Sequence, residues 1–332
     1  EGNSSYGTAI VGTVSGTSIS FGSPTVYVSA TATWQATTFD SNENKVVIAW
    51  QNGIRVGTVS GTSISFGTAT TFGNNNSSYK DMVFDTASNK VVIAYSDGGN
   101  SRYGTGIVGT VSGTSISFGT AVVFESDESN YVGMTFDSDA DKVVIVYEDN
   151  PNSRSGTAIV GTVSGTAISY GSPVVFSGST SEWCRVAFDS SNNKVVVVWN
   201  SVSVNGKAIV GTVSGTSISF GTEVVFQANN INYPRPVFDT SVNEMIIVYE
   251  NKDGTSYGTV IAVTVSGTSI SFGTAVVFEA ADTNHIGATF DSSNNKIVPA
   301  YADGDNSNYG TAVVISSVST NILSNRQLVA CE

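Results

Sequence analysis

The sequence predicts an all-β protein, and three observations carry this prediction. Gly, Ser, Thr, Val and Asn dominate the 332 residues, only 12% of residues are charged, and the straight-chain helix formers are scarce. No segment spaces its apolar residues by three and four, as an amphipathic helix would. The string Gly-Thr-Val-Ser-Gly-Thr-Ser-Ile-Ser-Phe-Gly recurs about every 50 residues, which indicates a repeat architecture.

The repeat contains two markers whose spacing defines its strands. The eleven-residue string stands at 12–22, 57–67, 109–119 and 211–221, with near copies at 161–171 and 263–273. The second marker, Phe-Asp, falls at Phe39, Phe84, Phe136, Phe188, Phe238 and Phe290. The third period reads as four strands, 131–136, 142–147, 158–163 and 167–176, separated by Gly, Asn, Asp and Ser as in β-hairpins.

Four antiparallel strands in about 50 residues is the length of a β-propeller blade, longer than a β-helix coil or a leucine-rich repeat. The six Phe-Asp hairpins predict one six-bladed propeller over residues 1–332. We expect residues 1–30 to supply outer strands that close the ring, 31–302 to hold six repeats, and 303–332 to form diverged outer strands and a C-terminal tail. Because an outer pair precedes the first inner pair, a seven-bladed ring is the alternative.

The repeat motifs also carry a family resemblance. Gly-Thr-Ala-Ile-Val-Gly-Thr-Val-Ser-Gly-Thr-Ser-Ile-Ser-Phe-Gly, combined with Phe-Asp-Ser-x-x-Asn-Lys-Val-Val-Ile, resembles repeats of marine bacteriophage tail-fibre and virion structural proteins and of marine microbial surface proteins. The resemblance covers the chain to about Ser316. It implies an extracellular or virion location and an adhesive role, and it carries over no catalytic residue.

Charge and composition exclude several partners. Asp and Glu outnumber Lys and Arg by 27 to 14, so the net charge of −13 repels nucleic-acid phosphates and anionic lipid. No apolar run approaches the roughly 18 residues of a membrane span, so no membrane insertion is expected. Cys184 and Cys331 fit no metal or redox spacing, and no cofactor is expected.

The turn after each Phe-Asp marker reads as scaffold. Asp40 and Asn44 flank an expected three-residue turn, because Asx side chains bond nearby backbone and tolerate left-handed conformations. One turn deviates: Asp137, Asp139 and Asp141 alternate like the carboxylates of a calcium loop. This is a weak calcium candidate, because Lys142 stands where an EF-type loop needs glycine and the sister turns need no metal.

Two sets of aromatic positions align between the repeats. The inner ring, five residues before each Phe-Asp marker, is Trp34, Tyr79, Tyr131, Trp183, Tyr233 and His285. The outer ring, at the end of the next strand, is Trp50, Tyr95, Tyr147, Trp199, Tyr249 and Tyr301. Each inner residue precedes its outer partner by 16 residues. If Asp40 faces Asn44, every pair lies directly opposite across one hairpin, and both rings share one face of the propeller.

The inner ring is the predicted ligand-binding site, because its residues differ between repeats while the scaffold stays fixed. The polar residues Lys80, Asp81, Arg185 and Arg235 on the inner strands complete the candidate site. Structural stacking on neighbouring rings is the alternative for the two arginines. The outer ring is expected mainly to pack within and between repeats. His285 is expected to be satisfied or loop-exposed rather than catalytic, since no second His or nearby Cys pair completes a zinc site.

No catalytic motif accompanies these features. The chain has no Gly-x-Ser-x-Gly elbow, His-Glu-x-x-His, phosphate-binding loop or dinucleotide fingerprint. Glycoside hydrolysis needs two facing carboxylates, and on the expected face only Asp81 lies on an inner strand. The sequence therefore predicts a non-enzymatic extracellular or virion-associated module that binds a cell-surface glycan or receptor. The alternative is a structural or docking spacer that contacts other virion or surface proteins.

Overall fold

The computed structural model describes residues 5–73, 76–201, 205–254, 256–316 and 328–330, and nearly all of them lie in β-strands or the turns between them. One short 3-10 turn, η1 (Gly304–Asn306), is the only helical element of this described part. The expected all-β fold is confirmed. None of the described helical segments is long and apolar enough to span a membrane. Residues 317–327 and Cys331, part of the expected C-terminal tail, lie outside the described residues.

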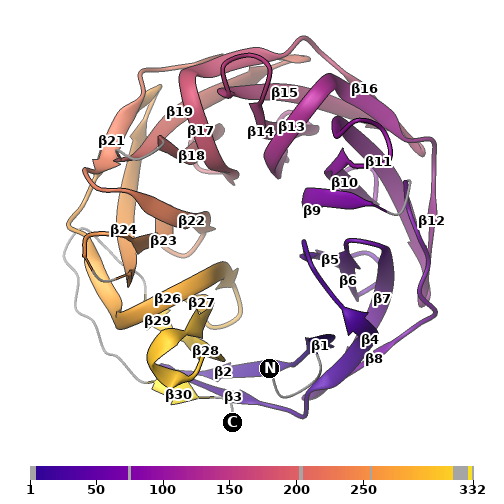
Figure 1. The fold of residues 1–332 in the computed structure, drawn as a ribbon, viewed down its shortest axis with the longest axis vertical. Coiled ribbons are helices and arrows are strands. Elements are labelled where there is room, and N and C mark those ends of the chain that lie inside the picture. The colour runs from indigo at the N-terminus through magenta and orange to yellow at the C-terminus, as the bar shows by residue number, and fades with distance from the viewer. Residues whose placement is uncertain (1–4, 74–75, 202–204, 255, 317–327, 331–332) are drawn as a thin grey trace. The chain divides into compact units, whose positions relative to one another are not determined.

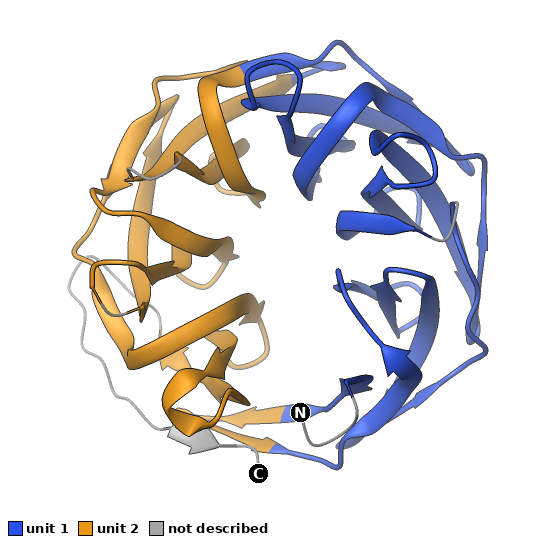
Figure 2. Cartoon of the chain, in the orientation of Figure 1, with its two compact units in different colours: residues 1–12, 21–175, 214–217 blue, residues 13–20, 176–213, 218–332 orange. Residues whose placement is uncertain are grey.

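The chain divides into two compact units (Figure 2). Unit 1 comprises residues 1–12, 21–175 and 214–217, and unit 2 comprises residues 13–20, 176–213 and 218–332. Unit 1 therefore contains the sheets of the first three repeats, and unit 2 contains most of the last three.

The strands follow the repeat (Figure 1). Before the first repeat stand β1 (Tyr6–Ala9), β2 (Gly12–Ser15), β3 (Ser18–Phe21) and β4 (Thr25–Thr31). Repeats 1 and 2 consist of β5 (Ala36–Asp40), β6 (Lys45–Trp50), β7 (Gly53–Ser60), β8 (Ser63–Phe66), β9 (Ser77–Asp85), β10 (Lys90–Asp97), β11 (Tyr103–Ser112) and β12 (Ser115–Phe118). Repeats 3 and 4 consist of β13 (Val122–Asp137), β14 (Lys142–Asp149), β15 (Ser155–Ser164), β16 (Ala167–Tyr170), β17 (Val174–Asp189), β18 (Lys194–Ser201), β19 (Asn205–Ser214), β20 (Ser217–Phe220) and β21 (Val224–Gln227). Repeats 5 and 6 consist of β22 (Ile231–Asp239), β23 (Glu244–Asn251), β24 (Tyr257–Ser266), β25 (Ser269–Phe272), β26 (Val276–Asp291), β27 (Lys296–Asp303), β28 (Tyr309–Val313), β29 (Ile315–Ser316) and β30 (Leu328–Ala330).

Repeats 2 to 5 are antiparallel sheets whose fourth strand comes in two pieces. In repeat 2, β10 pairs with β9 on one side and β11 on the other, and β12 pairs with the end of β11. The first part of β13 pairs with the start of β11, and β13 then continues into the sheet of repeat 3. The prediction of one continuous strand over 167–176 in repeat 3 is wrong, because this strand also comes in two pieces: β16 ends at Tyr170 and β17 begins at Val174.

A close backbone contact explains the break. A Cβ atom on Gly119, which follows β12, would lie 1.9 Å from the carbonyl oxygen of Thr166 in the turn of repeat 3. Only glycine allows two backbones to approach this closely. The same contact recurs where Gly22 meets Thr62 and where Gly67 meets Thr114. The repeated Ser-Phe-Gly thus serves as the point where one repeat rests on the Ser-Gly-Thr turn of the next.

The Asp-Asn turn is confirmed as scaffold, but its length was predicted wrongly. Asp85 Oδ1 accepts the backbone N–H groups of Ala87 and Ser88, both at 2.9 Å. Asn89 is left-handed, with φ 54°, and is the last residue of the turn. Asp85 therefore faces Lys90 rather than Asn89, and the turn has four residues. All pairings inferred from a three-residue turn shift by one residue.

The core lies between successive repeats. In repeats 2 to 5 the second strand is apolar on both faces because both faces are covered, as in Val91 to Tyr95. Val47 and Ala49 of repeat 1 pack with Met82 and Ile93 of repeat 2. Equivalent clusters join repeats 2 and 3 in unit 1, and repeats 4, 5 and 6 in unit 2.

Candidate functional site

The inner-ring side chains of successive repeats touch within each unit. In unit 1 the ring centroids of Trp34 and Tyr79 are 4.4 Å apart, and those of Tyr79 and Tyr131 are 5.0 Å apart. In unit 2 the distances are 4.5 Å from Trp183 to Tyr233 and 5.1 Å from Tyr233 to His285. We call these the unit 1 ladder (Trp34, Tyr79, Tyr131) and the unit 2 ladder (Trp183, Tyr233, His285). Each ladder begins with a tryptophan.

All six ladder residues have a left-handed backbone. Their φ values are 54°, 43° and 49° in the unit 1 ladder and 56°, 50° and 55° in the unit 2 ladder. Five of them coincide with a break in the strand register, where a β-bulge inserts an extra residue, and Trp34 lies two residues before β5. Glycine usually occupies such a bulge position. A side chain there costs about 1–2 kcal/mol, and six repetitions of this strain point to a function.

The ladder rings are partly open to solvent. Trp34 is 42% exposed. His285 is exposed as well, and the other four rings are half-buried. Neighbouring rings are inclined by 46° to 58°, so their faces do not stack flat on each other. A row of inclined, half-exposed aromatic faces is suited to stack against a flat ligand with an apolar face.

The inner and outer rings do not face each other as predicted. In repeat 2 Ala94 pairs with Asp81 and Ser96 pairs with Ser78, so the bulge leaves Tyr95 without a direct cross-strand partner. The outer-ring residues Trp50, Tyr95, Tyr147, Trp199, Tyr249 and Tyr301 are all buried. Five of them pack at centroid distances of 5.1–5.6 Å on a phenylalanine, as Tyr95 does on Phe72. The outer ring therefore has the packing role that the sequence indicated.

Lys80 lies directly behind the unit 1 ladder. Its Nζ donates hydrogen bonds of 2.9 Å to the backbone carbonyl oxygens of Trp34 and Ser77. The side chain is buried at 5% exposure, and burial lowers the pKa of its amine to about 7. The equivalent residues Val132, Cys184 and Ile286 are apolar and fully buried. Lys80 is thus an amine in a position built for an apolar side chain, and it fixes the backbone of the neighbouring tryptophan.

The other polar candidates hold the backbone next to the ladders. Asp81 accepts the N–H of Met82 at 2.9 Å and, across the repeat boundary, the N–H of Met134 at 3.1 Å. Arg235 Nε donates to the carbonyl of Ile286 at 3.0 Å, so it joins repeats 5 and 6 in the same way. Arg185 donates to the carbonyl of Cys184 at 2.7 Å. These contacts position the strands that carry the ladders.

The candidate calcium turn is built like its sisters. Asp137 Oδ1 accepts the N–H groups of Asp139 and Ala140 at 3.1 and 3.0 Å, and Asp141 takes the left-handed place of the usual asparagine. Within the described residues, no group of three or more His, Cys, Asp or Glu side chains is placed to hold a metal ion. The calcium hypothesis gains no support from this geometry.

Two buried glutamates near the ladders were not predicted as site residues from the sequence. Glu250 is fully buried and its Oε1 lies 2.7 Å from Lys252 Nζ. Burial, together with the Glu250 charge, raises the pKa of Tyr233 in the unit 2 ladder. Glu148 is buried and pairs with Arg154 at 3.0 Å. The available signal was alignment, because both glutamates follow an outer-ring residue directly, where repeats 2 and 4 have Ser96 and Asn200.

Comparison with known proteins supports the fold and leaves the site open. No protein-family model matches the chain, and no curated protein matches its sequence. The solved structure of PpgL, a periplasmic gluconolactonase of Pseudomonas aeruginosa, is similar with a TM-score of 0.66 over 98% of this chain and 96% of that chain. Only 11% of the aligned residues are identical, so the similarity defines a β-propeller-like all-β fold.

Proposed function

We propose that this protein is a non-enzymatic recognition module, extracellular or virion-associated, whose ladders bind a cell-surface glycan or receptor. The six repeats serve as the blades of a propeller in this proposal. The observation that carries it is the left-handed backbone of all six ladder residues. A fold that needed only packing there would place glycine or asparagine at these bulges, because both tolerate this conformation without an aromatic ring.

A glycan fits the chemistry of the ladders best. A pyranose has one face of C–H groups that stacks on an aromatic ring and a rim of hydroxyl groups that seeks hydrogen bonds. The unit 1 ladder offers the exposed ring of Trp34 and the half-buried ring of Tyr79, and Gln35 is exposed next to Trp34. Such shallow sites bind with Kd values of roughly micromolar to millimolar, and several sites on one surface raise the overall strength through avidity.

A glycan array followed by calorimetric titration tests the proposal. Trp34→Ala and Trp183→Ala are expected to weaken binding of the selected glycan, and the double variant is expected to abolish it. Phe39→Ala is the matched control, because Phe39 is 52% exposed and lies at the opposite end of β5 from Trp34. The proposal fails if the double variant binds as the wild type does.

The enzymatic alternative is tested in the same experiment. The name of the structurally similar protein, gluconolactonase, suggests a sugar-derived lactone as a probe. Hydrolysis of gluconolactone above the buffer rate, lost in Lys80→Met or Trp34→Ala, would overturn the non-enzymatic part of the proposal. Binding without hydrolysis would support it.

Docking to a larger assembly is the second candidate function, and one observation favours it. The five outer strands that begin at Thr25, Val122, Val174, Val224 and Val276 each expose one valine, namely Val26, Val123, Val175, Val225 and Val277. Single exposed apolar residues are normal on a protein surface, so they favour docking less than the ladders favour recognition. The test is a variant with these valines changed to Ser. If it still binds the glycan but no longer joins an assembly, docking becomes the favoured function.

A further inference from the structure

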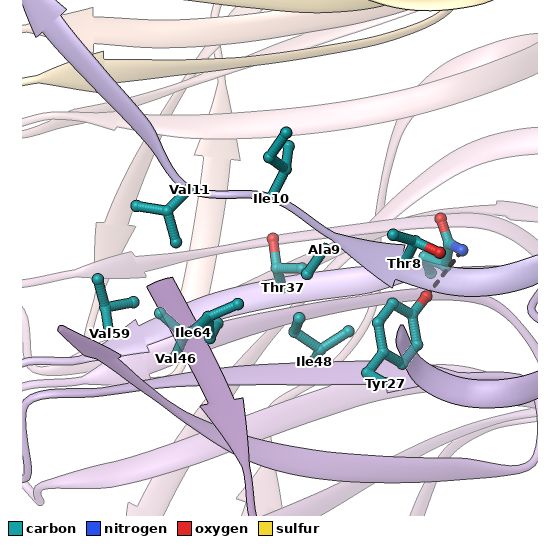
Figure 3. A pocket seen from close by; sticks show the side chains of 11 residues that line it. Thr8, Ala9, Ile10, Val11, Tyr27, Thr37, Val46, Ile48, Val59 and Ile64 are labelled. Carbon is teal, nitrogen blue, oxygen red and sulfur yellow. Dashed lines mark hydrogen bonds between the residues drawn. The ribbon is translucent and has the colours of Figure 1, made fainter. Parts of the chain in front are cut away.

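Unit 1 contains an apolar groove beside its first sheet (Figure 3). The groove has a volume of about 370 Å³ and lies between the segment Thr8 to Val11 and the sheet of repeat 1. Val46, Ile48, Val59 and Ile64 form its apolar wall. Tyr27 and Gln35 lie at one end of it, joined by a 2.8 Å hydrogen bond from Gln35 Nε2 to the Tyr27 hydroxyl oxygen.

The groove exists because one face of repeat 1 is uncovered. Phe39 is 52% exposed, whereas its counterpart Phe84 in repeat 2 is 9% exposed. Val59 is 43% exposed, whereas its counterpart Val111 is 6% exposed. The difference lies in what each face meets.

In repeat 2 the same face is covered by the first two strands of the preceding repeat. Val47 and Ala49 of β6 pack there against Met82 and Ile93. Repeat 3 repeats this contact, with Val92 and Ala94 of β10 against Met134 and Ile145. The chain therefore shows twice in unit 1 what covers this surface: a β-hairpin that presents two small apolar side chains from its second strand.

The backbone next to the groove has the matching arrangement. β11 of repeat 2 is flanked by β10 on one side and by β12 and β13 on the other. The equivalent strand β1 forms a two-stranded sheet with β4, in the register that β11 keeps with β13. Ala9 of β1 lines the groove.

We propose that this groove is a β-augmentation site for a β-hairpin with the sequence pattern of the repeat's own first two strands, supplied by another polypeptide segment. The second strand of the hairpin adds to β1, and its small apolar side chains fill the groove against Val46 and Ile48. Main-chain hydrogen bonds give such a complex its affinity and the side-chain pockets give it specificity. No ladder residue lines this groove, and Gln35 is the one residue that it shares with the proposed glycan site.

A labelled synthetic peptide of residues 129–149, the first hairpin of repeat 3, is the direct probe. We expect saturable binding to the full chain by fluorescence anisotropy. Val59→Trp, which fills the groove, is expected to weaken binding at least about tenfold through steric clash. Val123→Trp changes a valine of similar exposure, 41%, outside the groove, and is expected to bind as the wild type does.

A fusion keeps the test decisive, because an isolated hairpin is marginally stable in water. Residues 129–152 placed ahead of residue 1 are expected to raise the melting temperature and slow hydrogen exchange in β1, β5 and β6. The same fusion with Val144→Ser and Val146→Ser in the added hairpin is expected to lose both effects. No change in exchange with the intact fusion overturns the proposal. Self-association that Val59→Trp abolishes, without peptide binding, overturns it in favour of a surface for a second copy.

Discussion

Lys80→Met removes the buried amine behind the unit 1 ladder, and its effect on stability is expected to depend steeply on pH. The variant restores an apolar side chain of similar length at a position where repeats 3, 4 and 6 are apolar. The amine has a pKa of about 7 in the folded protein and 10.5 when exposed in the unfolded chain. Between these two values the unfolded chain binds a proton that the folded protein does not bind, so the stability of the wild type rises with pH.

The size of the effect follows from the gap between the two pKa values. Each pKa unit corresponds to about 1.4 kcal/mol, so the charged amine destabilises the fold by at most about 4–5 kcal/mol near pH 7. By about pH 9 the penalty falls to about 2 kcal/mol. The variant also loses the hydrogen bonds to Trp34 and Ser77, which costs about 1–3 kcal/mol for each carbonyl left unpaired and is nearly independent of pH. The free energy of unfolding of the variant, minus that of the wild type, should therefore fall by about 2 kcal/mol from pH 7 to pH 9. This change does not depend on the size of the difference at pH 7.

Urea unfolding of both proteins at several pH values between about 6 and 9 measures this change in the difference. An NMR titration of the Lys80 side-chain nitrogen measures the folded pKa directly. If the difference between the two proteins stays flat over this range, or if the nitrogen titrates near 10.5, the amine reaches water and the reasoning is wrong. Lys142→Met, at the half-buried start of β14, is the control and should show a flat difference.

Three further predictions compare matched positions. Gly119→Ala is expected to lower the free energy of unfolding by about 1–3 kcal/mol, because the new Cβ would meet the Thr166 carbonyl. Gly273→Ala is the control: the nearest atom to its new Cβ is 3.7 Å away, so its free energy of unfolding should stay within about 0.5 kcal/mol of the wild type. Equal melting temperatures of the two variants would contradict this. Tyr301→Phe should lower the free energy of unfolding by about 1–3 kcal/mol, since the Tyr301 hydroxyl donates to Glu279 at 2.9 Å. Tyr95→Phe should leave this free energy unchanged or raise it, because the Tyr95 hydroxyl has no hydrogen-bond partner among the described residues. His285→Gly should raise stability by about 1 kcal/mol in urea unfolding by relieving the left-handed strain, and a loss of stability would show that the contact with Tyr233 outweighs it.

Most of the strand pattern could be predicted from the repeat, because the residues that form its turns act on the backbone next to them. The Asp of each Phe-Asp marker binds the turn backbone, and glycine marks each Ser-Gly-Thr turn, so strand order and number within a repeat follow from the residues themselves. The register was off by one residue, because Asx chemistry identifies a turn without fixing whether three or four residues separate the strands. The break before Val122 was missed, since it depends on Gly119 meeting a carbonyl 47 residues away in the chain, as the Gly119–Thr166 contact shows.

The candidate site was found in part. Alignment of the repeats identified the ladder residues, and the structure brings them into contact within each unit. Their left-handed backbone could not be predicted, because the preferences of Trp and Tyr argue against it and only the surrounding sheet enforces it. Alignment also set Lys80 against valine, cysteine and isoleucine, which signalled burial. Its polar character instead suggested contact with a ligand, and that role stays a prediction.

The sixteen-residue strand β13 belongs to the sheets of repeats 2 and 3 at once, and β26 does the same for repeats 5 and 6. Repeats joined in this way cannot melt one at a time, since fraying of either sheet strips hydrogen bonds from a chain segment that its neighbour needs. A single repeat cut from the protein would lose half of a shared strand along with its partner surface. Insertion or loss of material should therefore be tolerated only in whole periods, which gives such a chain an easy route to change length during evolution while each period keeps its sequence.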